Sequence, residues 1–385
     1  MPDPPLHICF LCNEYPPHRH GGIGSFTQTL ARELVRHGHS VSIVGLYPIA
    51  ATSREDDEGV AVIRVPEGRV PGFRIACNYV RIQRVLRGLQ RERRIDVLEG
   101  AERSFCLVSP GLAVPKLIRM HGGHVFFRVA LGQAPNRQKV MEERRSFRVA
   151  THLCAVSRFV GETTRDYLGL GPRPIPVISN PVDLRIFYPR DPTLEEDGLI
   201  VYVGTIIEKK GIRQLLEAMP LVLKQHPSAR LVAYGNDTSD PATGESFTEI
   251  LRSRIPPEAQ GRIEFAGPVR RDLLPGLIAK ASICVYPSHM EALPIAWVEG
   301  LAMGKAVVAS ETGPGPEVLE HGVSGLLCDP HDPAAIAAAL LRFLRDRDLR
   351  IRFGRAARDR AEKLFALERL VDENVAFYRR CCAGY

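Results

Sequence analysis

The chain has 385 residues, which is long enough for two domains of ordinary size, each with its own core. Its composition, 45% hydrophobic and 25% charged, excludes a disordered or fibrous protein. The net charge of +7 is uneven, since residues 1–185 hold 26 Lys and Arg against 17 Asp and Glu, and the remainder holds 25 against 27. No nucleic-acid motif accompanies the basic first half, so we expect no nucleic-acid partner.

The ends and the cysteines of the chain indicate a cytoplasmic protein without a metal. The sequence MPDPPLHICFLC lacks the features of a secretion signal, and no apolar segment approaches the roughly 20 residues of a membrane helix. The nine cysteines are expected to be reduced core residues. Cys9 and Cys12 have CxxC spacing, but no second pair completes a zinc site. Asp346 and Asp348 form an Asp-x-Asp that we expect at the surface of a helix.

The chain begins with a predicted strand at residues 6–12, a glycine-rich loop and a helix at 25–37. In the loop, Gly22 and Gly24 can let the backbone approach a phosphate, or can simply form a tight turn. Residues 55–58 are predicted to be an acidic turn before a strand at 60–65.

A helix predicted at residues 75–93 carries two stripes of side chains. One stripe is apolar, and the other consists of arginines: Arg81, Arg84, Arg87, Arg91 and Arg94. The arginines can form a solvated face or can dock on anionic lipid headgroups. Two more strands follow, and the second ends in His121-Gly122-Gly123-His124, where a substrate could approach a histidine.

The second half repeats the alternation of strands and helices, which predicts a second parallel sheet. Its first strand, at residues 199–203, runs into a loop that carries Thr205 and Lys210 and ends at Gly211. Further on, a strand at 283–286 leads to a loop with Glu291, and the next helix carries Glu299. Open α/β sheets bind ligands beyond the carboxyl ends of their strands, so both carboxylates can face one cleft.

The segment PSHMEALPIAWVEGLAMGKAVVAS resembles the signature of retaining glycosyltransferases of the family-4 type, also called glycosyl transferases group 1. The resemblance covers almost the whole chain. It implies the α/β GT-B architecture, in which two Rossmann-like, doubly wound domains face a cleft. By position, residues 1–185 would be the acceptor-binding domain, 186–365 the nucleotide-sugar-binding domain, and 366–385 a helix that crosses back to the first domain.

The resemblance also implies roles for individual residues. Glu291 would contact the hydroxyls of the donor hexose, Glu299 would hold the ribose, and Lys210 would reach the diphosphate. His121, rather than His124, would lie near the reacting sugar. The catalytic candidates are therefore His121, Glu291 and Lys210, and the donor-binding candidates are Gly22, Gly24, Thr205, Lys210, Ala292, Leu293, Ile295 and Glu299.

Two departures from the family pattern concern the donor. Ala292-Leu293-Pro294 stands where the family has Gly-aromatic-Gly, and Thr205 stands where it has a diphosphate-binding arginine. A cation is expected there because the diphosphate leaving group gains negative charge in the transition state. Three other cations can replace the missing one: Lys209, Arg270 and Arg271.

The resemblance predicts a retaining, metal-independent hexosyltransferase without a cofactor. Its donor would be a UDP- or GDP-linked sugar and its acceptor a glycan, a lipid-linked sugar or a small molecule, in surface polysaccharide or glycoconjugate synthesis. The helix N-termini near Ile295 and Pro316 would assist Lys210, and the N-terminal domain could touch the anionic inner face of the membrane. Two alternatives are a GT-B epimerase or phosphorylase, and an inactive nucleotide-sugar-binding subunit.

Overall fold

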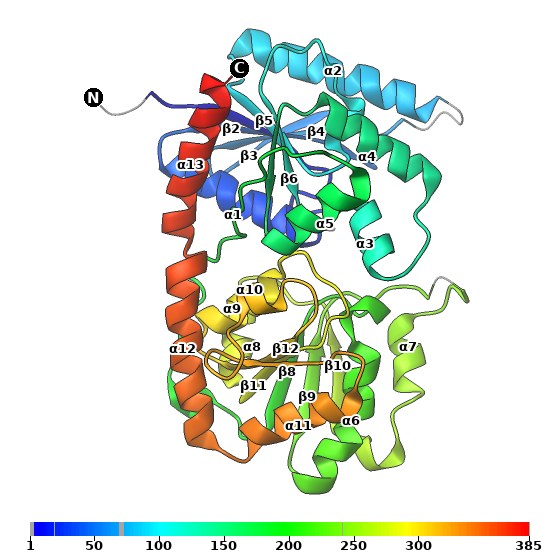
Figure 1. The fold of residues 1–385 in the computed structure, drawn as a ribbon, viewed down its shortest axis with the longest axis vertical. Coiled ribbons are helices and arrows are strands. Elements are labelled where there is room, and N and C mark those ends of the chain that lie inside the picture. Colours follow the sequence, from blue (N-terminus) through cyan, green and yellow to red (C-terminus); the bar gives the residue numbers. More distant parts are fainter. Residues whose placement is uncertain (1–3, 19, 69–72, 241, 385) are drawn as a thin grey trace. The chain divides into compact units, whose positions relative to one another are not determined.

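The computed structural model describes residues 4–18, 20–68, 73–240 and 242–384, which fold into two compact units (Figure 1). Unit 1 comprises Met1–Pro181 and Leu367–Tyr385, and unit 2 comprises Val182–Ala366. The chain therefore leaves unit 1 after Pro181 and returns to it after Ala366, where the sequence analysis placed the divisions after residues 185 and 365.

Unit 1 is built on a seven-stranded sheet in the order β3-β4-β2-β1-β5-β6-β7. All neighbouring strands are parallel except β3, which pairs with β4 in the antiparallel direction. The strands are β1 (His7–Leu11), β2 (Ser40–Tyr47), β3 (Ser53–Asp57), β4 (Val60–Pro66), β5 (Val97–Gly100), β6 (Lys116–Met120) and β7 (His152–Ala155). The central strands are buried on both faces, which is typical of a parallel sheet between two helical layers.

Strand β3 corrects one sequence-based prediction, because it occupies most of the segment that we expected to be an acidic turn. The turn itself is confined to Glu58 and Gly59, whose φ angles are 55° and 87°. Ion pairs hold the acidic edge strand in place: Glu55 pairs with Arg64, and Asp57 pairs with Arg32. The density of acidic residues suggested a solvated turn, but these cross-strand and helix partners stabilise a strand instead.

The helices of unit 1 are α1 (Gly22–Arg36), α2 (Arg74–Glu92), α3 (His124–Ala130), α4 (Arg137–Val149), α5 (Arg158–Leu168) and α13 (Leu367–Ala383), and a short 3-10 helix, η1, spans Ser104–Leu107. Helix α13 packs beside α1 (Figure 1). A buried network anchors it: Tyr378 donates to Glu99 over 2.7 Å, and Arg119 binds both Glu99 and Asn374. The C-terminal helix is thus an integral part of unit 1.

Unit 2 contains a six-stranded, fully parallel sheet in the order β10-β9-β8-β11-β12-β13. Its strands are β8 (Leu199–Val203), β9 (Arg230–Tyr234), β10 (Ile263–Gly267), β11 (Ile283–Tyr286), β12 (Ala306–Ser310) and β13 (Leu326–Cys328). The order reverses between β8 and β11, which lie side by side at the centre. Such a switch point is where doubly wound sheets bind their ligands.

The helices of unit 2 are α6 (Ile212–Gln225), α7 (Phe247–Arg252), α8 (Leu274–Lys280), α9 (Ile295–Ala302), α10 (Gly315–Val318), α11 (Pro333–Leu344) and α12 (Arg347–Phe365); the 3-10 helices are η2 (Pro192–Leu194), η3 (Glu208–Lys210) and η4 (Pro257–Ala259). Helices α6 and α11 pack against each other, and α12 packs on α9. Along the part of the chain that the structure describes, no helix is both long enough and apolar enough to cross a membrane.

Candidate functional site

The loops that follow β8 and β11 bring a lysine and a carboxylate together at the switch point of unit 2. Nζ of Lys210, at the end of η3, pairs with Oε1 of Glu291. The same oxygen accepts a hydrogen bond from Oγ of Ser288 over 2.7 Å. Both of these contacts are made by Oε1 and neither by Oε2. Glu291 is thus fixed through one oxygen and can accept from a ligand through the other.

Gly211 allows these two loops to approach closely. Its φ is +67°, in the left-handed region, and a Cβ atom on it would lie 1.7 Å from the carbonyl oxygen of Pro287. The backbone N–H of His289 also donates to the carbonyl of Lys209 over 2.9 Å. These backbone contacts hold the two loops together and so place Lys210 opposite Glu291.

We expect Gly211→Ala to destabilise the protein and to weaken the Lys210–Glu291 pair. The left-handed backbone alone costs about 1–2 kcal/mol for alanine, and the contact with Pro287 adds to that cost. The control is Gly276→Ala in α8, where a Cβ meets nothing within 4 Å and should be stabilising by about 0.5–1 kcal/mol. Urea unfolding measures both variants, and equal stability of the two would contradict the close approach of the loops.

Glu299 lies inside α9 and is 3% exposed. Nη2 of Arg271 is 2.8 Å from its Oε1, an ion pair that lacks hydrogen-bond geometry, because that oxygen has no hydrogen-bond partner among the described residues. Burial raises the pKa of Glu299, and the charge of Arg271 opposes that change. A buried carboxylate with an oxygen that lacks a hydrogen bond is suited to accept hydroxyl groups from a ligand.

Of the three cations that could replace the missing arginine, two lie beside the acidic residues. Arg271 pairs with Glu299, whereas Arg270 is 80% exposed at its side chain and pairs with Asp272. Lys209 is close enough to Glu291 for the carboxylate to raise its pKa, but burial is stronger and lowers it overall. Arg271 and Lys209 are therefore better placed than Arg270.

The other predicted donor contacts of unit 2 surround this group. Ala292 and Leu293 are buried in the loop before α9, and Pro294 is the N-cap residue of that helix, directly before Ile295. The carbonyl of Thr205 accepts a hydrogen bond from the hydroxyl of Tyr202 over 3.0 Å. The structure thus places Thr205, Ala292 and Leu293 in the loops after β8 and β11, and Ile295 at the first position of α9.

The glycines of unit 1 differ from the prediction. Helix α1 begins at Gly22 rather than at residue 25, so Gly22 and Gly24 lie in its first turn and not in a loop. The carboxylate of Glu14 accepts the N–H groups of Gly21 and Gly24 at 3.3 and 2.8 Å. A Cβ on Gly24 would lie 2.0 Å from the carbonyl oxygen of Glu14. Close packing of this turn explains Gly24, and a phosphate there would compete with Glu14.

His121 follows β6, and its ring packs against that of Phe26 with 4.8 Å between ring centroids. Burial and the nearby charge of Arg119 lower the pKa of His121 to about 3. Its imidazole is therefore neutral at physiological pH and can bind a ligand without acting as a cation. The ring of His124 is engaged elsewhere, because it accepts a hydrogen bond from the N–H of Asn136 over 2.9 Å.

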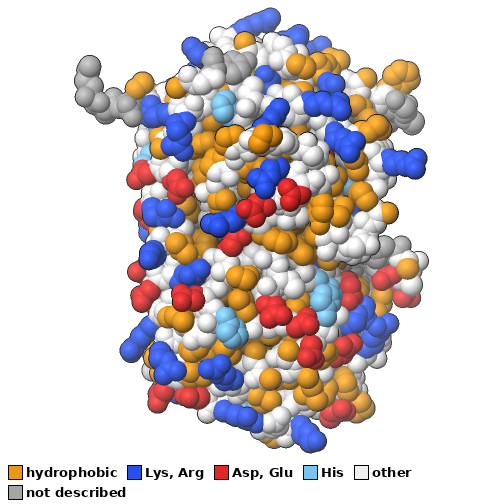
Figure 2. Space-filling model, viewed as in Figure 1, with side chains coloured by type: hydrophobic (Ala, Val, Ile, Leu, Met, Phe, Trp, Pro, Cys, Tyr) orange, Lys and Arg blue, Asp and Glu red, His pale blue; other side chains and the backbone are white. Residues whose placement is uncertain are grey.

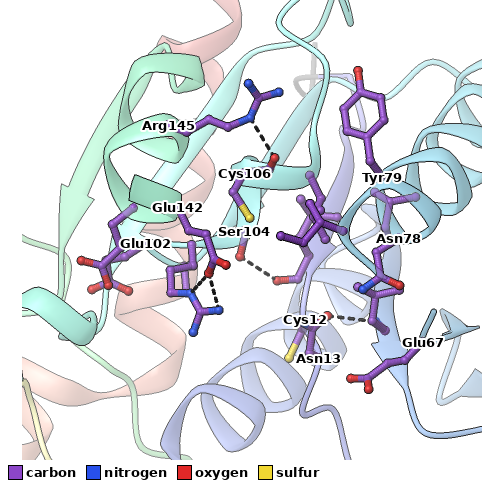
Figure 3. Close-up of a pocket in the computed structure, with 18 of the residues that line it drawn as sticks. Cys12, Asn13, Glu67, Asn78, Tyr79, Glu102, Ser104, Cys106, Glu142 and Arg145 are labelled. Carbon is purple, nitrogen blue, oxygen red and sulfur yellow. Dashed lines mark hydrogen bonds and ion pairs between the residues drawn. The ribbon is translucent and has the colours of Figure 1, made fainter. Parts of the chain in front are cut away.

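Unit 1 also contains a cavity of about 1090 Å³ that the sequence analysis did not predict (Figure 3). It is lined by β1, by α2 and α4, and by the segment after β5, where Glu102 is 3% exposed. Oε1 of Glu102 has no hydrogen-bond partner within the described residues. Its one sequence signal was a carboxylate shortly after a buried strand of a parallel sheet.

Burial, assisted by the carboxylate of Glu143, raises the pKa of Glu102 to about 8, although the N–H groups of Gly122 and His121 oppose the change. The folded protein therefore binds a proton that the unfolded chain, with a pKa of 4.5, releases. Stability should fall as the pH rises from about 4.5 to 8. Relative to Glu102→Gln, we expect a loss on the order of 3 kcal/mol between pH 5 and pH 9. Urea unfolding at a series of pH values measures this loss. If the free energy of unfolding has the same pH dependence in both proteins, the prediction is wrong.

The architecture and this chemistry together define a class of protein. Two doubly wound sheets, the second of which carries a lysine, two buried carboxylates and an arginine in the loops and the helix that follow its strands, define the GT-B class of glycosyltransferases. Sucrose-phosphate synthase from Thermosynechococcus elongatus has the same fold, with a TM-score of 0.83 and 20% identity over 99% of this chain and 100% of that one. HepE from Anabaena, solved with UDP and glucose, gives a TM-score of 0.77 at 16% identity over 97% and 100% of the two chains.

Sequence comparison identifies the family. The profile "Glycosyltransferase Family 4" matches residues 20–186, and "Glycosyl transferases group 1" matches residues 187–360. A glycogen synthase from Mycobacterium tuberculosis is 27% identical over 387 residues, covering 92% of this chain and 90% of that protein. The chain belongs to the family-4-type glycosyltransferases with the GT-B fold.

Proposed function

We propose that this glycosyltransferase moves a hexose from a nucleotide sugar to a hydroxyl of an acceptor, with retention of the anomeric configuration. The observation that carries the proposal is the group formed by Lys210, Glu291, Glu299 and Arg271 in unit 2. The similarity to HepE, which was solved with UDP and glucose, supports a UDP-linked donor, and a GDP-linked donor fits the same residues. The similarity to a glycogen synthase supports an acceptor in glycan or glycoconjugate synthesis.

Each residue of the group has a role that its chemistry supports. Glu299 accepts the ribose hydroxyls, because its buried oxygen lacks a hydrogen bond. Glu291 accepts the hexose hydroxyls through Oε2, since Oε1 is held by Lys210 and Ser288. Lys210 supplies the positive charge that stabilises the departing diphosphate, which gains negative charge in the transition state. Arg271 is the proposed replacement for the diphosphate-binding arginine whose position Thr205 occupies.

The proposed retention follows from what the site residues can do. Glu291 is tied to Lys210 and Ser288, so we assign it to hydroxyl recognition rather than to covalent attack on the sugar. The acceptor hydroxyl then attacks from the face that the diphosphate leaves, and an oxygen of the leaving group takes its proton. His121 remains our predicted contact of the donor sugar, as a neutral hydrogen-bonding group.

Incubation with UDP-glucose, UDP-galactose, GDP-mannose and a mixed pool of glycan acceptors tests the proposal. We expect one donor to be consumed with release of its nucleoside diphosphate, and a product whose one-bond carbon–hydrogen coupling shows the donor's anomeric configuration. An inverted product would overturn retention. Consumption of donor without any acceptor, giving an isomerised or free sugar, would favour an epimerase or a hydrolytic enzyme instead.

Helix α2 supports a further part of the proposal, a peripheral contact with anionic lipid. Arg84, Arg87 and Arg91 are exposed on α2, and hydrophobic Phe73 and Val80 are 66% and 54% exposed. Figure 2 shows basic and hydrophobic side chains interspersed over the part of unit 1 where Figure 1 draws α2. This combination binds anionic membranes. Co-sedimentation with phosphatidylglycerol vesicles, but not with phosphatidylcholine vesicles, is expected, and equal binding to both would contradict it.

A further inference from the structure

The cavity of unit 1 is larger than one sugar ring needs. Its volume of about 1090 Å³ slightly exceeds the roughly 300–1,000 Å³ that pockets for drug-sized ligands occupy. Figure 3 shows Glu102 and Glu142 at one end of it, and Asn78, Tyr79 and Glu67 at the other. A ligand that fills the cavity must therefore be extended, with different chemistry along its length.

The end at Glu102 is a polar site with an unmet hydrogen bond. Glu102 is 3% exposed, and its Oε1 has no partner within the described part of the chain. The neighbouring Glu143 is already engaged, because it accepts the N–H groups of His124 and Val125 at the start of α3. Gly123 makes room for both carboxyl groups, since a Cβ there would lie 2.6 Å from Oε1 of Glu143.

This environment determines what Glu102 can bind. A buried carboxyl oxygen without a hydrogen bond costs about 1–3 kcal/mol, which a donor from a ligand can recover. Because its pKa is raised to about 8, the group is largely protonated at neutral pH and can both donate and accept. A hydroxyl group matches that pair of functions, whereas a phosphate would be repelled by the carboxylate of Glu143.

Part of the cavity wall is apolar. Leu11 of β1, Val44 and Leu46 of β2, and Ile82 of α2 all line it. They are hydrophobic side chains on the strand ends and on the inner face of α2, so they present a surface that a hydrocarbon chain or ring can cover. A fully polar acceptor would leave its hydroxyl groups unpaired against this wall, at a cost in binding free energy.

The apolar surface continues to the outside at the rim. Ile75 and Val80 of α2 and Met141 of α4 line the cavity and are 53%, 54% and 65% exposed. Exposed hydrophobic side chains that join the lining of a pocket extend its apolar wall to solvent. A ligand bound at Glu102 can thus leave the cavity between α2 and α4 with its apolar part still covered.

We infer that this cavity binds an amphiphilic acceptor, whose hydroxylated head donates to the carboxyl group of Glu102 and whose apolar part covers the hydrophobic wall that includes Leu46 and reaches the exposed hydrophobic rim of α2 and α4. The identification of this ligand as the acceptor rests on the proposed glycosyl transfer. The binding itself depends only on unit 1. The proposal assigns Glu102 as an acceptor-binding residue and selects lipid-linked or otherwise apolar-substituted acceptors over free glycans.

Equilibrium dialysis with two labelled probes tests the inference. The probes are octyl β-glucopyranoside, used below its critical micelle concentration, and methyl β-glucopyranoside, which has the same head without the apolar chain. We expect the full-length protein to bind the octyl probe at least tenfold more tightly than the methyl probe. Glu102→Leu should weaken octyl binding at least tenfold, and Met141→Glu severalfold. The control Val323→Glu, at a residue of unit 2 that is 47% exposed, should leave it unchanged.

Three results would overturn the inference. The protein could bind both probes equally, Glu102→Leu and Met141→Glu could both bind the octyl probe as tightly as the unaltered protein, or the control Val323→Glu could weaken octyl binding as much as the cavity variants do. Met141 is exposed on α4, so its variant keeps the test decisive if Glu102→Leu fails to fold. UDP binding by the same samples separates this proposal from the proposed function. If the unaltered protein does not bind UDP, this result counts against the proposed glycosyl transfer but not against the cavity. The comparison of the two probes then still shows whether the cavity binds an amphiphilic ligand.

Discussion

Replacing Lys210 with alanine is expected to lower kcat by about 100- to 1,000-fold, the effect of removing one group that stabilises transition-state charge. Lys210 is the cation at the end of η3, and its Nζ pairs with Glu291. The variant removes the charge that faces the leaving diphosphate and releases one partner of Glu291. Because the interaction is strongest in the transition state, KM for the donor should change far less than kcat.

Steady-state kinetics with the identified donor measure this effect, and two further variants interpret it. Lys210→Arg keeps the charge and should retain more activity than the alanine variant. Lys224→Ala removes an exposed lysine of α6 and should match the unaltered enzyme. Since Lys210→Ala also removes one partner of Glu291, the folded fraction must be confirmed by circular dichroism. A kcat within threefold of the original in a folded Lys210→Ala protein would show that another group holds the diphosphate.

Replacing Glu299 with alanine is expected to raise the Kd for the donor about 10- to 100-fold, which corresponds to about 1.5–3 kcal/mol for hydrogen bonds to a charged group. The carboxylate lies inside α9, and its Oε1 has an ion pair to Arg271 but no hydrogen bond among the described residues. If that oxygen receives the ribose hydroxyls, the free nucleoside diphosphate should lose as much affinity as the nucleotide sugar. Isothermal titration with both ligands measures the two losses.

Arg271→Ala tests the same pair from the other side. It should destabilise the fold, toward the lower end of the 3–5 kcal/mol typical of a broken buried pair, because the side chain of Arg271 is 31% exposed. The double variant Arg271→Ala/Glu299→Gln should recover part of that loss, since no buried charge is left unpaired. If the double variant is no more stable than Arg271→Ala alone, Glu299 does not depend on Arg271 for its charge.

The centre of unit 2 could be predicted closely from the sequence. The strand expected at residues 283–286 is β11, Ile283–Tyr286, and Glu299 lies in the helix that follows it. Short apolar runs there are separated by proline and glycine, which mark the ends of elements clearly. Lys210 and Glu291 are far apart in sequence, and their proximity followed only from the resemblance to a family.

Other features depend on contacts that a sequence does not display. The hydrogen bond from Ser288 to Glu291 and the ion pair between Arg271 and Glu299 arise from how neighbouring segments pack. The start of α1 at Gly22 depends on Glu14, which caps the helix from an earlier loop. Glu102 looked like an ordinary acidic residue after a strand, because its burial is produced by Gly123 and by the segments packed around it. Local patterns predict elements better than they predict such long-range partners.

The central claim is that unit 2 binds a nucleotide sugar, and thermal unfolding with a panel of ligands tests it most directly. A ligand at 100 times its Kd stabilises the folded state by about 2.7 kcal/mol, which raises Tm measurably. We expect one nucleoside diphosphate among UDP, GDP and ADP to raise Tm, its sugar conjugate to raise Tm further, and both shifts to shrink in Glu299→Ala. Unchanged Tm values with every diphosphate and every nucleotide sugar would contradict donor binding and, with it, the proposed transfer.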